Sequence, residues 1–107
     1  MRRSFDQSLL SDLRAMSSVD ALASLATHIK ADSTFVPFKD ARTQRWHVHT
    51  ERGDFEILTT GSKWYDTRAR RGGGGAIDLA MHLCDLSFVD AVRRLATINA
   101  RHGSDHP

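Results

Sequence analysis

Four consecutive glycines constrain this chain more than any other feature, because they separate a cluster of arginines from a helical pattern. The glycines are Gly72, Gly73, Gly74 and Gly75, and the arginines before them are Arg68, Arg70 and Arg71. Backbone N–H groups in a glycine loop can point outward, and the N-terminus of a helix attracts anions. The stretch therefore predicts a phosphate-binding loop. It matches neither the P-loop pattern GxxxxGKS/T nor the dinucleotide pattern GxGxxG.

The size of the chain and the placement of its charges narrow the function classes. With 107 residues the chain can bury one modest core, so we expect a single domain over residues 1–107. The formal net charge is only +2, but Lys63 and the three arginines fall within nine residues. A local basic patch on a nearly neutral protein fits a polyanionic partner. The alternative is a solvated, charged loop.

Cysteine content and apolar runs limit the cellular setting. Cys84 is the only cysteine, which excludes an intramolecular disulfide and a thiol-rich metal site. The chain has no apolar run of transmembrane length, and its first residues, MRRSFDQS, lack the apolar core of a signal peptide. We therefore expect a cytoplasmic protein with no membrane partner.

The spacing of the apolar residues divides the chain into helical ends and a strand-rich middle. Residues 1–33 and 75–100 show helical spacing, and the second range is split into two helices. Residues 34–66 alternate as short strands do, and residues 67–75 form a loop rich in arginine and glycine. Residues 101–107 are expected to fray. The predicted fold class is α+β: a small antiparallel meander of three to four strands flanked by N-terminal and C-terminal helices.

Alternation within the strand-rich middle assigns side chains to faces, because successive residues of a strand point in opposite directions. Trp64 and Tyr65 are therefore expected on opposite faces, so that one of the two is available to a ligand. His47 and His49 share one face. They are expected to form an exposed surface instead of a metal site, because no third ligand accompanies them at a telling spacing.

Two motifs in the C-terminal half belong together in a known family. Gly74-Gly75-Ala76-Ile77-Asp78 matches a Gly-Gly turn that leads into a helix, and Leu86-Ser87-Phe88 with Ala91-Val92 matches the start of the next helix. In this order the chain resembles the N-terminal zinc-binding (CHC2-type) domain of bacterial replicative primases. It is more similar to the zinc-less relatives of that domain at the head of Toprim primase-like proteins of plasmids and integrative conjugative elements.

The resemblance also assigns four positions to the metal site of the family. Val36-Pro37-Phe38-Lys39 aligns with a Cys-Pro-x-His motif, and Thr67 and Arg70 align with Cys-x-x-Cys. None of the four residues present is a usual zinc ligand. The resemblance therefore implies a zinc-ribbon-like core without zinc and without a cofactor, held by apolar packing. Two of the four positions are basic, which suggests that phosphate affinity has replaced metal binding.

The function implied by the resemblance is that of a DNA-binding accessory module in a mobile-element replication, primase or conjugative transfer system. Single-stranded DNA is the favoured partner. The residues support this, because cationic side chains neutralise phosphates, glycines allow close approach and aromatic rings stack on bases. The candidate nucleic-acid-binding residues are Lys39, Lys63, Trp64, Tyr65, Arg68, Arg70, Arg71, Gly72, Gly73, Gly74 and Gly75.

Two other function classes are alternatives to DNA binding. A protein–protein adaptor would dock or inhibit a primase, helicase or relaxase through the apolar residues of its first helix, Leu9, Leu10, Leu13 and Met16. A metal-dependent phosphoryl transferase would use acids such as Asp66, but nothing pairs with Asp66 at a recognisable spacing. Primer synthesis would need a Toprim domain, so we expect no enzymatic activity from these 107 residues.

Overall fold

The structure, a computed structural model, describes residues 6–104, with side chains up to residue 98. The elements follow in the order α1 (Gln7–Ala15), α2 (Ser18–Leu25), β1 (His28–Ala31), β2 (Gln44–Thr50), β3 (Gly53–Thr60), β4 (Lys63–Asp66), β5 (Arg71–Gly74), α3 (Ala76–Cys84) and α4 (Phe88–Ser104). The predicted α+β class, with helices at both ends of an antiparallel sheet, is confirmed. No helix in the described part of the chain is long and apolar enough to cross a membrane.

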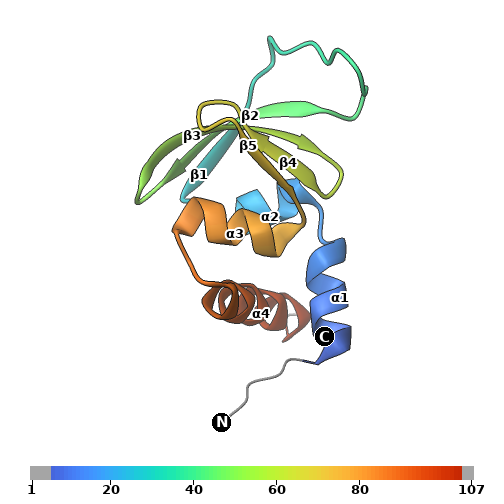
Figure 1. The fold of residues 1–107 in the computed structure, drawn as a ribbon, viewed down its shortest axis with the longest axis vertical. Coiled ribbons are helices and arrows are strands. Elements are labelled where there is room, and N and C mark those ends of the chain that lie inside the picture. Colours follow the sequence, from blue (N-terminus) through green and yellow to red (C-terminus); the bar gives the residue numbers. More distant parts are fainter. Residues whose placement is uncertain (1–5, 105–107) are drawn as a thin grey trace.

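The sheet is a five-stranded antiparallel meander in the order β1-β2-β3-β4-β5 (Figure 1). The two strands at its edges were not predicted. The prediction of helix throughout residues 1–33 is wrong for β1, because α2 ends at Leu25, with Ala26 as its C-cap, and Ile29 then pairs with Val48. Ile29 fits both a helical and a strand spacing, so the pattern alone did not separate the two. β5 replaces part of the loop predicted over residues 67–75.

The fraying of residues 101–107 stays a prediction. Residues 101–104 continue α4 as helix, and residues 105–107 lie outside the described range. The structure therefore describes the backbone of this tail only as far as Ser104.

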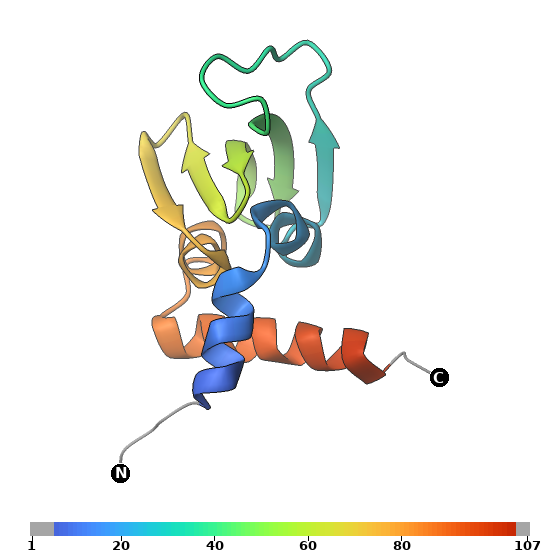
Figure 2. The ribbon, with the colours of Figure 1, turned by 90° about the vertical axis from the view of Figure 1, so that its right-hand side faces the viewer.

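All the described helices lie on the same face of the sheet, and none covers the opposite face (Figures 1 and 2). The core fills the space between the sheet and the helices α2 and α3, and it continues between α3, α1 and α4, which lies further from the sheet (Figure 1). Its fully buried large apolar side chains include Leu13, Leu22, Ile57, Leu79, Leu83 and Leu95. The uncovered face is left with the outward-pointing side chains of the strands.

Helix α1 contributes to this core instead of offering a docking surface. Leu10 and Leu13 are buried, and Leu9 and Met16 pack against the core from positions that are partly buried. The adaptor hypothesis placed its contact surface on these four residues, and that placement is wrong. The apolar spacing of a helix does not tell whether its stripe faces its own core or a partner.

Helix α2 is tied to the strand that carries the candidate aromatic residues. Ser18 is fully buried, its backbone N–H donates to the carbonyl of Gly61 at 2.9 Å, and its hydroxyl donates to the carbonyl of Lys63 at 2.9 Å. These bonds satisfy buried polar groups and fix the β3–β4 turn against the helical layer. The start of β4 is therefore fixed by hydrogen bonds from the helical side of the sheet.

Candidate nucleic-acid interface

Alternation along β4 separates its two aromatic residues. Trp64 faces the helices and is 5% exposed, whereas Tyr65 lies on the uncovered face and is 42% exposed. The prediction that these side chains point to opposite faces is confirmed. Trp64 belongs to the core, where its indole stacks on the imidazole of His82 with the ring centroids 5.0 Å apart. Tyr65 is therefore the aromatic residue of β4 that a ligand can reach.

Three of the four glycines form an edge strand, so the predicted glycine loop is wrong for them. In β5, Gly72 lies opposite Tyr65 and Gly73 lies opposite Trp64. A Cβ added to Gly73 would lie 2.9 Å from Cζ2 of Trp64, and a Cβ added to Gly72 would lie 3.0 Å from Cδ1 of Tyr65. Glycine is thus favoured at Gly73 by the close approach of the indole and at Gly72 by the backbone carbonyl of Trp64, 2.9 Å from an added Cβ, together with the ring of Tyr65.

Gly75 is the only glycine of the run that leads into a helix. It is the N-cap residue of α3 and has a φ of 106°, a conformation that favours glycine. Its N–H donates to the carbonyl of Ser62 at 2.7 Å. This N–H is used inside the fold, so it does not contribute to the phosphate cradle that the sequence suggested.

The three arginines do not gather at one place. Arg68 and Arg70 lie in the turn between β4 and β5, whereas Arg71 begins β5 opposite Asp66, which places it on the helix-facing side. Oδ1 of Asp66 accepts the backbone N–H groups of Arg68 and Ala69 at 3.0 Å each, which holds the turn. The turn therefore presents Arg68 and Arg70 at the far end of β4.

At the near end of β4, four of the predicted residues come together around a groove on the uncovered face. The loop of residues 32–43 forms one wall, and β3 and β4 form the other. The groove has a volume of about 470 Å³ and is lined mainly by Phe35, Phe38, Lys39, Leu58, Lys63 and Tyr65. Trp64 also borders it, although the indole is buried. Phe38 is 93% exposed.

Sequence reasoning missed the apolar part of this groove. Phe35, Phe38 and Leu58 were not among the candidate residues, because their proximity to Tyr65 depends on how the loop of residues 32–43 folds over the sheet. The one signal in the sequence was Phe38 beside Lys39, an aromatic and a cationic side chain together in a polar segment.

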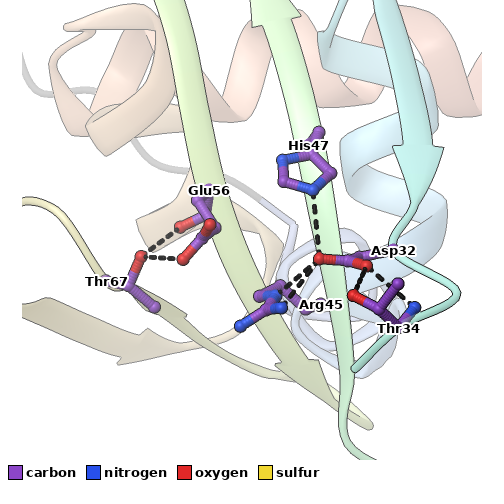
Figure 3. Close-up of polar contacts among 6 residues, drawn as sticks. All are labelled: Asp32, Thr34, Arg45, His47, Glu56 and Thr67. Carbon is purple, nitrogen blue, oxygen red and sulfur yellow. Dashed lines mark hydrogen bonds and ion pairs between the residues drawn. The ribbon is translucent and has the colours of Figure 1, made fainter. Parts of the chain in front are cut away.

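Asp32 anchors the start of the loop (Figure 3). Its carboxylate accepts the N–H and the hydroxyl of Thr34 at 2.9 and 2.6 Å and pairs with Arg45 at 2.8 Å. A ring nitrogen of His47 lies 3.2 Å from the same carboxylate. The bonds from Thr34, and then that from Arg45, hold the pKa of Asp32 well below its usual range. The guanidinium of Arg45 lies 5.0 Å from the ring centroid of Phe35.

Asp40 anchors the end of the loop through its contact with Arg42. The N–H of Arg42 and its guanidinium each donate to the carboxylate at 2.9 Å, and these bonds lower the pKa of Asp40 to about 2. Neither Lys39 nor Lys63 takes part in a salt bridge with a described residue. The acids of the loop are therefore paired already, and the two lysines beside the groove are available to an anion.

The positions that the resemblance assigns to zinc ligands lie at two ends of the sheet. Val36 and Lys39 belong to the loop of residues 32–43, whereas Thr67 and Arg70 belong to the β4–β5 turn. The hydroxyl of Thr67 donates to the carboxylate of Glu56 at 2.6 Å (Figure 3). Within the described residues, no group of three or more histidine, cysteine or acidic side chains is placed to hold a metal ion.

A second cleft lies on the other side of β4, between the β4–β5 hairpin and α3. It has a volume of about 690 Å³, and its lining includes side chains of both charges, among them Arg52, Arg71, Asp66, Asp78 and Asp85. Its three acids outnumber its two arginines, whereas the charged residues of the groove on the uncovered face are two lysines and Asp40, which is bonded to Arg42, so this cleft is less suited to a polyanion. The groove on the uncovered face is the better candidate for nucleic acid.

The second cleft contains a contact that sequence reasoning did not find. Oδ2 of Asp66 lies 2.7 Å from Nε2 of His82, and the two side chains are 3% and 14% exposed. The sequence offered no partner for Asp66 at a recognisable spacing, and the structure supplies one in His82 of α3. The two residues are 16 positions apart on different elements, so no local spacing reveals the pair.

No protein-family model matches the chain, and no curated protein or solved structure matches it at a significant level. The resemblance to the primase zinc-binding domain therefore stays a prediction from the sequence motifs.

Proposed function

We propose that this protein binds single-stranded nucleic acid, with single-stranded DNA as the favoured form, across the uncovered face of its sheet. The observation that carries the proposal is the groove in which Phe38 and Tyr65 expose aromatic rings beside Lys39 and Lys63. Proteins that bind single strands combine a positive track with aromatic side chains on which bases stack. The bases of a duplex are stacked on one another, so they do not offer their faces to such a groove.

Charges at both ends of β4 mark a path for the phosphate backbone. Lys63 begins the strand beside the groove, and Arg68 and Arg70 follow its end. The length of β4 is about 10 Å at about 3.3 Å per residue. Tyr65 lies on the outward face between these charges. A single strand laid along β4 would meet cations at both ends and the aromatic ring between them.

The biological setting of this binding rests on the resemblance alone. It supports an accessory module of a mobile-element replication, primase or conjugative transfer system that acts in the cytoplasm. In such a system a module of this kind holds DNA for a second protein. A primase, helicase or relaxase is the natural candidate for that partner. No catalytic role is assigned to the chain.

The rival adaptor function would have to use a different surface, because Leu10 and Leu13 are buried. The most exposed large apolar side chains in the described residues are Val36 and Phe38, both on the loop of residues 32–43. A protein that docked there would compete with DNA for the groove, so adding such a protein to the DNA titration would release the labelled strand.

The test is fluorescence anisotropy of a labelled oligothymidylate and of a labelled duplex, each titrated with the protein at several salt concentrations. We expect tighter binding to the single strand. Replacing both Lys39 and Lys63 by alanine should reduce the slope of log K against log salt by about 1.4, because each phosphate contact on a single strand contributes about 0.7.

Arg93→Ala is the matched control, because Arg93 is exposed on α4, on the helical side of the molecule. It removes one positive charge and should leave the salt slope unchanged. Failure to bind either oligonucleotide at low salt would refute the proposal. Equal affinity for the duplex would refute the preference for single strands.

A further inference from the structure

We infer that the groove is a pocket for one unpaired base, which stacks on Tyr65 and is enclosed by Phe38. This inference rests on the proposed function and deepens it, because it names the part of the strand that enters the groove. Three features of the groove suit a base: the supported ring of Tyr65, the exposed ring of Phe38 and the lysines at the rim.

The ring of Tyr65 is supported by both neighbouring strands. On β3 its direct cross-strand neighbour is Leu58, and on β5 it is Gly72, where an added Cβ would lie 3.0 Å from Cδ1 of the ring. The ring is therefore flanked on two sides while the residue stays 42% exposed. An aromatic platform that is already in place loses little conformational freedom when a base stacks on it.

The opposite wall of the groove, formed by the loop of residues 32–43, contributes two phenylalanine rings, one fixed by its neighbours and one exposed. Phe35 lies under the guanidinium of Arg45, which Asp32 holds in turn. Phe38, three positions further along the same loop, is 93% exposed and lines the groove. A phenylalanine ring in water is unfavourable, and contact with the flat apolar face of a base would bury it.

Two hydroxyls in the groove suit the edge of a base without selecting one base. Thr43 and Thr60 line the groove, and their hydroxyl oxygens lie 2.7 Å apart in a hydrogen bond. Because each hydroxyl can donate or accept, the pair can meet either kind of group on a base edge. We therefore expect all four bases to be accepted with similar affinity.

The charges at the rim favour a base over an apolar peptide side chain. Lys39 and Lys63 flank the groove without a salt bridge to any described residue, and the nearby carboxylate of Asp40 is occupied by Arg42. A base in a strand brings a phosphate on each side, which matches two cations beside an apolar pocket. An apolar peptide would bring no new counter-charge to either lysine, and Asp40 alone, already bonded to Arg42, would face Lys63.

The test uses an oligothymidylate with a single 2-aminopurine at its centre, whose fluorescence is quenched when the base stacks on an aromatic ring. Binding of the wild-type protein should quench it. Phe38→Ala and Tyr65→Ala should each lose most of the quenching and weaken binding about 5- to 150-fold, the effect of one lost base stack. The salt slope should persist, because the cations remain.

Two variants serve as controls for this experiment. Val36→Ala removes a side chain that is 80% exposed on the same loop but does not line the groove, so it should change neither quenching nor affinity. Tyr65→Phe keeps the ring and should retain the quenching. Because Phe38 and Tyr65 are exposed, the thermal melts of their alanine variants should follow that of the wild type.

The outcomes separate the pocket from the proposed function. Salt-sensitive binding with no quenching, and with no effect of Phe38→Ala or Tyr65→Ala, would overturn the pocket and leave the function standing. Absence of binding would overturn both. Thymidine monophosphate should compete far more weakly than the oligonucleotide; equal competition would overturn the assignment to a base within a strand in favour of a free nucleotide. Binding of an apolar peptide in the groove, with no quenching of the 2-aminopurine when the oligonucleotide binds, would also overturn the inference.

Discussion

Oδ2 of Asp66 lies 2.7 Å from Nε2 of His82, and this contact joins the end of β4 to α3. Asp66 is 2% exposed, and its other carboxylate oxygen accepts the N–H groups of Arg68 and Ala69. A single buried carboxylate therefore fixes both the helix beneath the sheet and the turn that presents Arg68 and Arg70. Buried polar groups that are fully bonded in this way specify one arrangement of the elements around them.

Replacing Asp66 by alanine should lower the free energy of unfolding by about 3 kcal/mol, because the N–H groups of Arg68 and Ala69 lose their acceptor and His82 loses its partner. Asp66→Asn retains an acceptor for the turn and should lose less, about 1 to 2 kcal/mol. Urea unfolding followed by tryptophan fluorescence measures both values.

The pair of His49 and Asp54 supplies the control for this prediction. Its atoms are 2.6 Å apart, but the side chains are 59% and 70% exposed. Asp54→Ala should therefore change the stability little, because solvent screens an exposed ion pair. Similar losses for Asp66→Ala and Asp54→Ala would contradict the role assigned to the buried contact.

The same carboxylate should make the fold less stable in acid. Burial raises the pKa of Asp66, but hydrogen bonds from Ala69, His82 and Arg68 together lower it more, so the pKa lies below the ordinary value of 3.8. Because the unfolded chain takes up this proton at a higher pH than the folded one, the stabilisation is fully present above about pH 5 and is lost as the pH falls through the folded pKa.

Urea unfolding of the wild type and of Asp66→Asn over a series of pH values tests this dependence. The stability difference between the two proteins should shrink as the pH falls below about 4, since asparagine does not titrate. A difference that stays constant down to the acid limit would show that the charge of Asp66 contributes nothing.

Gly73→Ala should destabilise the fold by about 1 to 3 kcal/mol, the usual effect of forcing extra atoms into a packed site. The added Cβ would lie 2.9 Å from Cζ2 of the buried indole of Trp64. Gly74→Ala is the matched control on the same edge strand, since its Cβ would meet nothing within 4 Å. It should leave the stability unchanged or raise it by up to about 1 kcal/mol. Equal melting temperatures for the two variants would mean that the indole moves aside freely.

Much of the fold could be predicted because one face of the sheet is buried and the other is not. The period-two pattern around Val48 and Ile57 therefore indicated the strands and their faces, and it separated Trp64 from Tyr65. The strand formed by the glycines gave no such signal, because glycine has no side chain to alternate. Only the contact of Gly73 with Trp64 across the sheet explains why that segment lacks side chains.

The candidate site could be predicted only in part, for a related reason. Lys39, Lys63 and Tyr65 were expected to act together, and they border one groove. Phe38 and Leu58 complete that groove through contacts between a loop and two strands, which no spacing along the chain reports. Residue types can be read from a sequence, but their convergence depends on tertiary packing.

Substitutions of the arginines distinguish two sites for the DNA: a path along the outward face of β4, and the glycine loop that the sequence predicted. Arg68→Ala combined with Arg70→Ala should reduce the salt slope of single-strand binding by about 1.4, because two phosphate contacts are lost. The loss should be the same for every base composition, since phosphates carry no sequence information. Arg71→Ala should have little effect, because Arg71 lies opposite Asp66 on the helix-facing side. Anisotropy titrations at a series of salt concentrations measure these slopes. If Arg71→Ala alone matched the double variant, the strand would have to enter the cleft beside α3, and the path along the outward face would be wrong.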